Sequence, residues 1–304
     1  MYFFKRLITL PVLLLIVGTL AFLLVRMAPG GPFDGQRDLG TEEAEVEIRR
    51  QYNLDQPIHL QYSQFLKNLL KGDLGLSLKY RHHTVNEIIG QGLPISMALG
   101  CLAFLVALGL GIPLGALASI RQGQWSDYLI SAWALSCLCI PSFVIGPLLV
   151  LTFAIELKWA PVALWGSPIH AILPVLTLGL FFAGRIVRLM KEGTATALTN
   201  PYVRTAKAKG LRPSQVFYRH ILPTAVLPVV SYSGPLLAEL LTGSFVVENL
   251  FRIPGIGVFM VNGSINRDYT LIVGLVVLYA AVLILLNLIV DALYAWIDPR
   301  VRYD

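Results

Sequence analysis

Charged residues are scarce in this chain. Asp, Glu, Lys and Arg make up 14% of its 304 residues, whereas hydrophobic residues make up 56%, and the mean hydropathy is +0.68. About a quarter of the residues of a soluble globular domain are usually charged, so this composition argues against one. It predicts instead apolar segments long enough to cross a lipid bilayer.

Cysteine is also rare, which excludes two further classes of site. The three cysteines, Cys101, Cys137 and Cys139, all fall inside long apolar runs, so the sequence supports neither a disulfide framework nor a zinc site. The net charge of +6 comes from Lys and Arg beside the apolar runs, without the aromatic-interleaved patch of a nucleic-acid-binding domain. We therefore expect no nucleic-acid partner.

The motifs of several kinds of active site are missing. The chain has no G-x-x-x-x-G-K-[ST] loop to hold phosphates, so it has no ATPase site of its own. No nucleophile with a base is placed convincingly in an apolar run, which disfavours a membrane hydrolase. His59, His82, His83 and Glu87 offer metal ligands, but no further ligand follows at a fixed spacing. We expect no metal and no covalent chemistry.

Apolar runs, by contrast, are numerous. In a bilayer every backbone polar group must be bonded within its own segment, so a run of about 20 apolar residues predicts a helix. We expect an all-α polytopic membrane protein, with a single transmembrane domain over residues 1–304 and no large soluble part. The six predicted spans are residues 7–26, 94–119, 128–156, 170–190, 226–247 and 271–297.

The Lys and Arg residues of the short loops predict the orientation, because short loops that are rich in Lys and Arg stay in the cytoplasm. The short loops of one side carry only Lys158, Arg252 and Arg267. We expect that side to be outside, together with a loop of short helices over residues 28–93, and we expect both termini and the loop 191–225 in the cytoplasm. The eleven inner residues are Lys5, Arg6, Arg121, Lys191, Arg204, Lys207, Lys209, Arg212, Arg219, Arg300 and Arg302.

The inner loop contains "TAKAKGLRPSQVFYRHILP", with helix signals on both sides of its first part. Asn200 suits an N-cap, Pro201 the first helical position and Gly210 a left-handed residue after the last turn, which predicts a helix of about nine residues. Pro213 can begin a second helix that Pro223 should end. So short a helix is marginal in water, so we expect it to dock on a protein partner. The alternatives are that its charge only holds the topology, or that it lies on the inner leaflet.

The same segment resembles a known family. Ala206, Gly210, Leu222 and Pro223 form the spacing A-x-x-x-G-x(11)-L-P. This is similar to the cytoplasmic EAA loop of ABC-importer permeases, whose consensus is EAA-x(3)-G-x(9)-I-x-L-P. The match is partial, because the consensus has Glu, Ala and Ile where this chain has Arg204, Thr205 and His220.

Other segments resemble the peptide-importer branch of that family. They are "VRTAKAKGL", "RMAPGGPFDG", "YNLDQPIHLQY", "GDLGLSLKY" and "IPSFVIGPLLV". The last third, with "SYSGPLLAELLTGSFVVENLFRIPGIGVFMVNGSINRDYT" and "DALYAWIDPRVRY", looks like the B-type membrane subunit of oligopeptide permeases. The resemblance extends along nearly the whole chain.

The resemblance implies a type I ABC-importer permease fold and import of oligopeptides by alternating access. The chain would lie in the lipid of a bacterial inner membrane. Its protein partners would be a second homologous permease subunit, two ATP-binding subunits and an external solute-binding protein. ATP and Mg would be bound by the partner subunits and no cofactor by this chain. The first loop helix would be the coupling helix that seats in an ATP-binding subunit. The implied coupling residues are Tyr202, Arg204, Thr205, Ala206, Lys207, Gly210, Leu211, Leu222 and Pro223.

Glu239 is the clearest charged residue deep inside a predicted span. Such a charge is costly in lipid, so it indicates a functional position by default. Together with Ser231 and Ser233 it could line a polar pathway or bind the amino end of a peptide; the alternative is a protonated acid bonded between helices. The family usually carries a small residue here, so the resemblance assigns Glu239 no role.

The outer segment over residues 248–270, hereafter the plug segment, mixes apolar residues with Pro254, Gly255 and Gly257. We expect it to pack over the bundle, and the resemblance implies that it faces the binding protein. Arg185, Arg188 and Lys191 share a helical face at the inner end of the fourth span. We expect them to reach lipid phosphate or the inner loop.

Two other functions stay open from the residues themselves. An ion-coupled secondary transporter would use a protonatable Glu239 as its coupling site. An ABC importer could also carry another small solute, such as nickel. The first would work without any ATP-binding partner, which distinguishes it from both importers.

Overall fold

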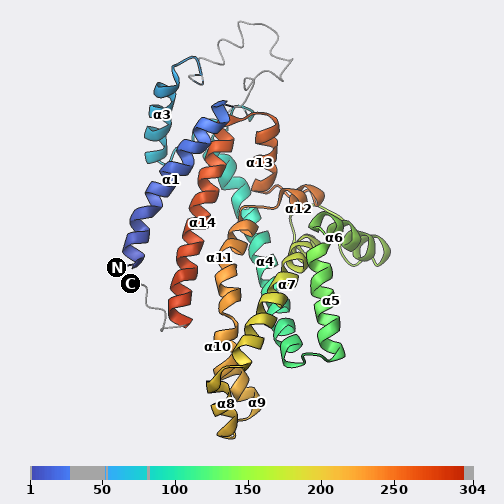
Figure 1. Cartoon of the computed structure of the whole chain (residues 1–304). Helices are drawn as coiled ribbons and strands as arrows, with labels where there is room; N and C mark the ends of the chain where they lie inside the picture. The colour runs from blue at the N-terminus through green and yellow to red at the C-terminus, as the bar shows by residue number, and fades with distance from the viewer. Residues whose placement is uncertain (1, 28–51, 53, 81–82, 298–304) are drawn as a thin grey trace.

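The computed structural model describes residues 2–27, 52, 54–80 and 83–297, and these form a bundle of helices (Figure 1). Within these ranges there is no β-strand beyond one bridge between Leu76 and Thr84. In chain order the elements are α1 Tyr2–Met27, α3 Ile58–Leu70, α4 Val85–Ile120, α5 Trp125–Cys139, α6 Ser142–Leu149, the π-helical η2 Val150–Glu156, α7 Pro168–Leu198, α8 Pro201–Ala208, α9 Pro213–Val216, the π-helical η3 Phe217–Ile221, α10 Leu222–Ala225, α11 Leu227–Leu241, α12 Phe245–Leu250, α13 Ile256–Ile265 and α14 Tyr269–Ile297.

Five helical stretches of the described chain are long and apolar enough to cross a membrane. They correspond to five of the six predicted spans and confirm the all-α polytopic fold. Their bounds are Thr9–Met27, Val85–Ile120, Pro168–Leu198, Leu227–Leu250 and Tyr269–Leu293.

Two of these helices extend beyond the predicted spans. α4 begins at Val85 because Thr84 and Glu87 form a capping box. In that box Glu87 N donates to Thr84 Oγ1 at 3.1 Å, and Thr84 N donates to Glu87 Oε2 at 3.0 Å. α7 continues past residue 190 to Leu198. The predicted outer loop 28–93 therefore ends earlier than expected, and the inner loop 191–225 begins later.

The remaining predicted span, 128–156, is not one straight helix. α5 ends at Cys139, and the helical segment that begins at Ser142 is bent from it by 108°, so that α6 turns away from the end of α5 (Figure 1). Pro141 accounts for the break, because proline disfavours the helical conformation in the preceding residue. Ile140 is accordingly extended, with φ −88° and ψ 116°. The bent pair makes a sixth span only if it is counted as one.

The centre of the bundle is the packing of α4 against α7, which contact each other along much of their length. Leu99 and Ala103 of α4 and Ile186 and Met190 of α7 are buried there. A side chain at Gly111 would not fit, because a Cβ at that position would lie 2.5 Å from the Cβ of Ile186. Small residues of this kind let helices approach closely in a membrane, where lipid supplies little drive for association.

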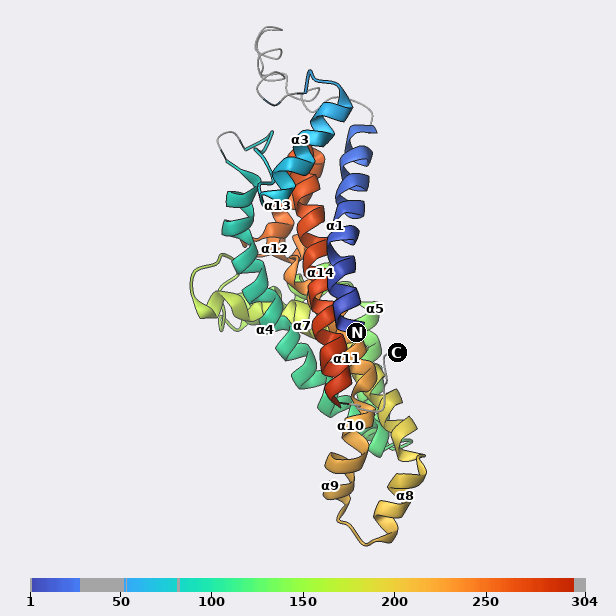
Figure 2. The same ribbon diagram turned by 90° about the vertical axis from the view of Figure 1, so that its left-hand side faces the viewer.

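The bundle has two distinct ends (Figures 1 and 2). α3 and α13 lie at one end, and α8 and α9 project from the other. α3 matches the helix expected within the outer loop and packs on α1 through Phe22, whose ring centroid lies 5.3 Å from those of both Tyr62 and Phe65. Residues 28–51, 53 and 81–82 of that predicted loop lie outside the described residues.

Candidate functional site

The most prominent projection of the molecule is a helical hairpin over residues 200–225 (Figure 2), hereafter called the coupling hairpin after the role that the family resemblance implies for it. α8 begins at Pro201 and is followed by Gly210, whose φ of +77° makes the turn that the sequence predicted. Asn200 occupies the N-cap position, but its side chain accepts no capping bond. Instead its Nδ2 donates to the Thr196 carbonyl at 3.4 Å. Local backbone preferences therefore set both ends of this helix.

The second half of the hairpin differs from expectation. Pro223 was expected to end the helix that begins at Pro213, but the helical course runs on through η3 into α10. The prediction was wrong because Pro223 lies in the first turn of α10, where its missing N–H costs nothing. The wider π-helical turn over Phe217–Ile221 joins the two α-helical pieces.

The coupling hairpin has a buried face and an exposed face. The buried face contains four apolar residues at 4% exposure or less, so Ala206 faces inward with Val203, Val216 and Ile221. Leu222 is half-buried, and Pro223 is exposed. The other implied coupling residues are exposed, namely Tyr202, Arg204, Thr205, Lys207, Gly210 and Leu211.

The exposed face of the hairpin is strongly basic. Within the described part of the chain, none of its Lys or Arg side chains forms an ion pair. These cations are therefore available to an acidic partner surface. They are Arg204, Lys207, Lys209, Arg212 and Arg219.

The three predicted pathway residues do not share one face of α11. Ser231 and Glu239 are exposed, with exposed Pro235 between them, whereas Ser233 is half-buried on the other side of the helix. Both serine hydroxyls donate to carbonyls of their own helix, Ser231 to Leu227 at 3.1 Å and Ser233 to Val229 at 2.8 Å. The structure therefore groups Glu239 with Ser231 and separates it from Ser233.

Arg185 of α7 lies beside Tyr232 of α11 and within electrostatic range of Glu239, which the sequence did not indicate. Its guanidinium carbon is 4.9 Å from the centre of the Tyr232 ring, and it interacts electrostatically with both Tyr232 and Glu239. Arg185 and Glu239 are both exposed. Two opposite charges therefore face the same side of α7 and α11.

The other two basic residues of α7 are neutralised by acids of the bundle. Lys191 pairs with Asp127 of α5 and donates to Ser131 Oγ at 2.9 Å. Arg188 Nε lies 3.1 Å from Glu192 Oε1. Both residues thus pair with acids on α5 and on α7 itself rather than with the inner loop, while the alternative contact with lipid phosphate stays a prediction.

The plug segment is organised by a buried carboxylate, Glu248, which has no exposed surface. Ser96 of α4 donates its hydroxyl to Glu248 Oε1 at 2.6 Å, and Val258 N donates to Oε2 at 3.3 Å. The Ser96 hydroxyl also accepts from Ile256 N at 2.8 Å. This carboxylate therefore joins the first turn of α13 to α4, across 152 residues of sequence.

Glycines surround this carboxylate and explain part of the predicted plug. A Cβ at Gly257 would lie 3.0 Å from Glu248 Oε2, and one at Gly255 would also collide with the carboxylate. The sequence indicated both glycines but missed Glu248 and Ser96. An acidic residue in an otherwise apolar segment, followed by glycines, was the available signal for Glu248, whereas Ser96 had none.

A second buried carboxylate, Asp268, fixes the other end of the plug segment. It is fully buried and accepts from Leu271 N at 3.0 Å, which caps the start of α14. It also accepts from Lys79 N at 3.1 Å and from the hydroxyl of Ser77. This end of the bundle is thus held together by hydrogen bonds between distant segments.

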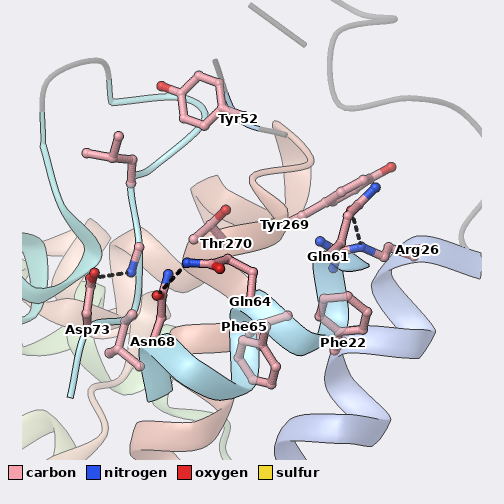
Figure 3. A pocket seen from close by; sticks show the side chains of 14 residues that line it. Phe22, Arg26, Tyr52, Gln61, Gln64, Phe65, Asn68, Asp73, Tyr269 and Thr270 are labelled. Carbon is pink, nitrogen blue, oxygen red and sulfur yellow. Dashed lines mark hydrogen bonds between the residues drawn. The ribbon is translucent and has the colours of Figure 1, made fainter. Parts of the chain in front are cut away.

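A pocket of about 290 Å³ opens beside the plug, between α1, α3 and the start of α14 (Figure 3). Arg26 lies over the Phe22 ring with its guanidinium carbon 3.5 Å from the ring centre, and its Nε donates to Gln61 Oε1 at 3.0 Å. Asp73 points away from this group and accepts from Gly75 N at 2.9 Å (Figure 3). These polar groups serve the packing of α3 on the bundle.

Comparison with known proteins gives a consistent result. The family described as "Binding-protein-dependent transport system inner membrane component" matches residues 111–303, and the N-terminal part of the same kind of component matches residues 1–99. The oligopeptide transport system permease protein OppB of Haemophilus influenzae is 42% identical over 99% of both chains. The dipeptide transport system permease protein DppB of Bacillus subtilis is 38% identical over 99% of this chain and 97% of its own.

Solved structures support the fold. An inward-facing structure of the MetNI methionine ABC transporter matches with a TM-score of 0.58 at 17% identity, over 69% of this chain and 96% of the other. At this identity the likeness concerns the fold alone. It agrees with the ABC-importer permease fold expected from the sequence.

Proposed function

This chain belongs to the family of binding-protein-dependent transport system inner membrane components, and from that premise we propose that it translocates oligopeptides in an ATP-driven importer. It is a multi-pass protein of the bacterial inner membrane and a transport subunit, with ATP hydrolysis left to separate subunits. The observation that carries the peptide cargo is the 42% identity to an oligopeptide permease over 99% of the chain. Nickel or another small solute is the alternative cargo, and no comparison favours it.

The proposed complex contains a second homologous permease, two ATP-binding subunits and an external solute-binding protein. Residues 1–304 act as a single permease domain. The basic exposed face of the coupling hairpin seats on an ATP-binding subunit, which also binds ATP and Mg. The plug segment, with Pro254, Gly255 and Gly257, faces the binding protein at the opposite end. Both termini would then lie in the cytoplasm, as the Lys and Arg distribution predicts.

Short links join the coupling hairpin to two long helices of the bundle, as alternating access would require. Only Thr199 and Asn200 separate α7 from α8, and α10 leads into α11 through Val226 alone. A displacement of α8 by the ATP-binding subunits is therefore transmitted to both helices. α7 carries Arg185 and α11 carries Glu239. Movement of the ATP-binding subunits would therefore shift these two residues of the proposed pathway.

The test of this proposal is retention of the ATP-binding subunits by the detergent-purified permease, compared between wild type and Gly210→Pro. Proline cannot adopt the φ of +77° found at Gly210. We expect the variant to lose most of the ATP-binding subunit while wild type retains it.

Gly72→Pro is the matched control for this experiment. Gly72 has a φ of +74° and, like Gly210, donates its N–H at 3.0 Å to the carbonyl three residues earlier, but it lies at the other end of the bundle. It should retain the ATP-binding subunits. A wild type that binds no ATP-binding subunit would contradict the proposal and revive the ion-coupled alternative.

A further inference from the structure

Two opposite charges, Arg185 and Glu239, lie within the apolar membrane-spanning stretches and form no ion pair with each other. Arg185 lies within the span Pro168–Leu198 and Glu239 within Leu227–Leu250, near the centre of both. In the described chain the Glu239 carboxylate receives no hydrogen bond and forms no ion pair. Charged side chains within membrane spans are costly in lipid, so we expect these groups to face water, substrate or another protein.

The geometry holds the two charges apart on one surface. Tyr232 and Glu239 are seven residues apart on α11, which places them on the same side two turns from each other. Arg185 is held over the Tyr232 ring at 4.9 Å and still attracts Glu239. A donor and an acceptor are thus presented together, whereas Arg188 and Lys191 of the same helix are already paired.

We propose that Arg185, Tyr232 and Glu239 form a site for the amino-terminal end of the transported peptide. Glu239 accepts from the α-ammonium group, and Arg185, positioned by Tyr232, donates to the first peptide carbonyl. Every unblocked peptide carries this ammonium and carbonyl whatever its side chains, so the site suits cargo of varied sequence. The inference rests on the proposed function and adds to it a selectivity for a free amino terminus.

The experiment is direct binding to the purified transporter complex in the absence of the solute-binding protein. Trialanine and N-acetyl-trialanine are the two probes, and wild type is compared with Glu239→Gln. We expect wild type to prefer free trialanine by about tenfold or more, the scale of one charge-assisted hydrogen bond. Glu239→Gln should abolish that preference by weakening trialanine alone.

Two further variants sharpen the test. Ser233→Ala is the control, because Ser233 is half-buried and bonded to its own helix, and it should keep the wild-type preference. Arg185→Gln should weaken binding of both probes equally, because both carry the first carbonyl. An unchanged preference in Glu239→Gln would overturn the proposal, and so would a wild type that binds neither probe.

The remaining outcomes separate this inference from the proposed function. Loss of the second permease subunit from Glu239→Gln would make Glu239 an interface residue and would overturn the peptide site. ATP-dependent uptake of trialanine by the wild-type transporter with its binding protein tests the function itself. If that uptake occurs while the preference is unchanged in Glu239→Gln, only the peptide site fails.

Discussion

The plug segment and the coupling hairpin lie at opposite ends of the bundle and are stabilised in different ways. The plug segment is tied to α4 and to residues 77–79 by the buried carboxylates of Glu248 and Asp268. The hairpin is held mainly by buried apolar side chains, with one side-chain hydrogen bond between its arms, Tyr202 Oη to Thr224 Oγ1 at 3.0 Å. The difference indicates that the plug end is fixed by bonds between distant segments, whereas the hairpin is joined to the bundle mainly through its short links to α7 and α11.

The largest expected effect is on the carboxylate that fixes the plug. Glu248→Ala leaves Ser96 Oγ and the N–H of Val258 without their acceptor inside the protein. We expect the free energy of unfolding to fall by about 3 kcal/mol or more, measured by thermal or denaturant unfolding in detergent. The control Glu192→Ala removes an exposed acid and should change stability by less than about 1 kcal/mol. Equal effects would contradict the contrast between the two ends.

An intermediate effect comes from matched glycine substitutions at the two ends. Gly243→Ala adds a Cβ 2.6 Å from Glu248 Oε1 at a φ of +86°, whereas Gly210→Ala adds one in open space at +77°. The first suffers backbone strain and a clash, about 2–3 kcal/mol in all; the second suffers only strain, about 1 kcal/mol. Unfolding of both variants under one set of conditions measures the difference, and a larger cost at Gly210 would be the contrary result.

The smallest effect is expected for Tyr202→Phe. This variant removes the 3.0 Å hydrogen bond to Thr224, an exposed contact worth about 0.5–1 kcal/mol. Hydrogen exchange should become faster over residues 201–225 while the plug segment keeps its protection. Faster exchange in both regions would show that the hairpin does not open independently.

The sequence was most informative where structure depends on nearby residues. Pro201 and Gly210 delimit α8 because they act through their own backbone torsions. The prediction that Pro223 ends a helix was wrong, because the effect of a proline depends on its position in the helix. Pro223 lies in the first turn of α10, and the π-helical turn before it lets the helical course continue. The run 128–156 predicted a single span, because its apolar composition does not reveal that the segment after Pro141 turns by 108°.

The membrane-spanning helices, the scarcity of charge and the family motifs were determined by the sequence alone, because in lipid each helix must satisfy its own backbone hydrogen bonds. Tertiary structure alone decided the pairing of Ser96 with Glu248 and the placement of Arg185 over Tyr232. Those contacts join segments 152 and 47 residues apart, since 248 − 96 = 152 and 232 − 185 = 47. Their partners are chosen by how the helices pack, which no local spacing specifies.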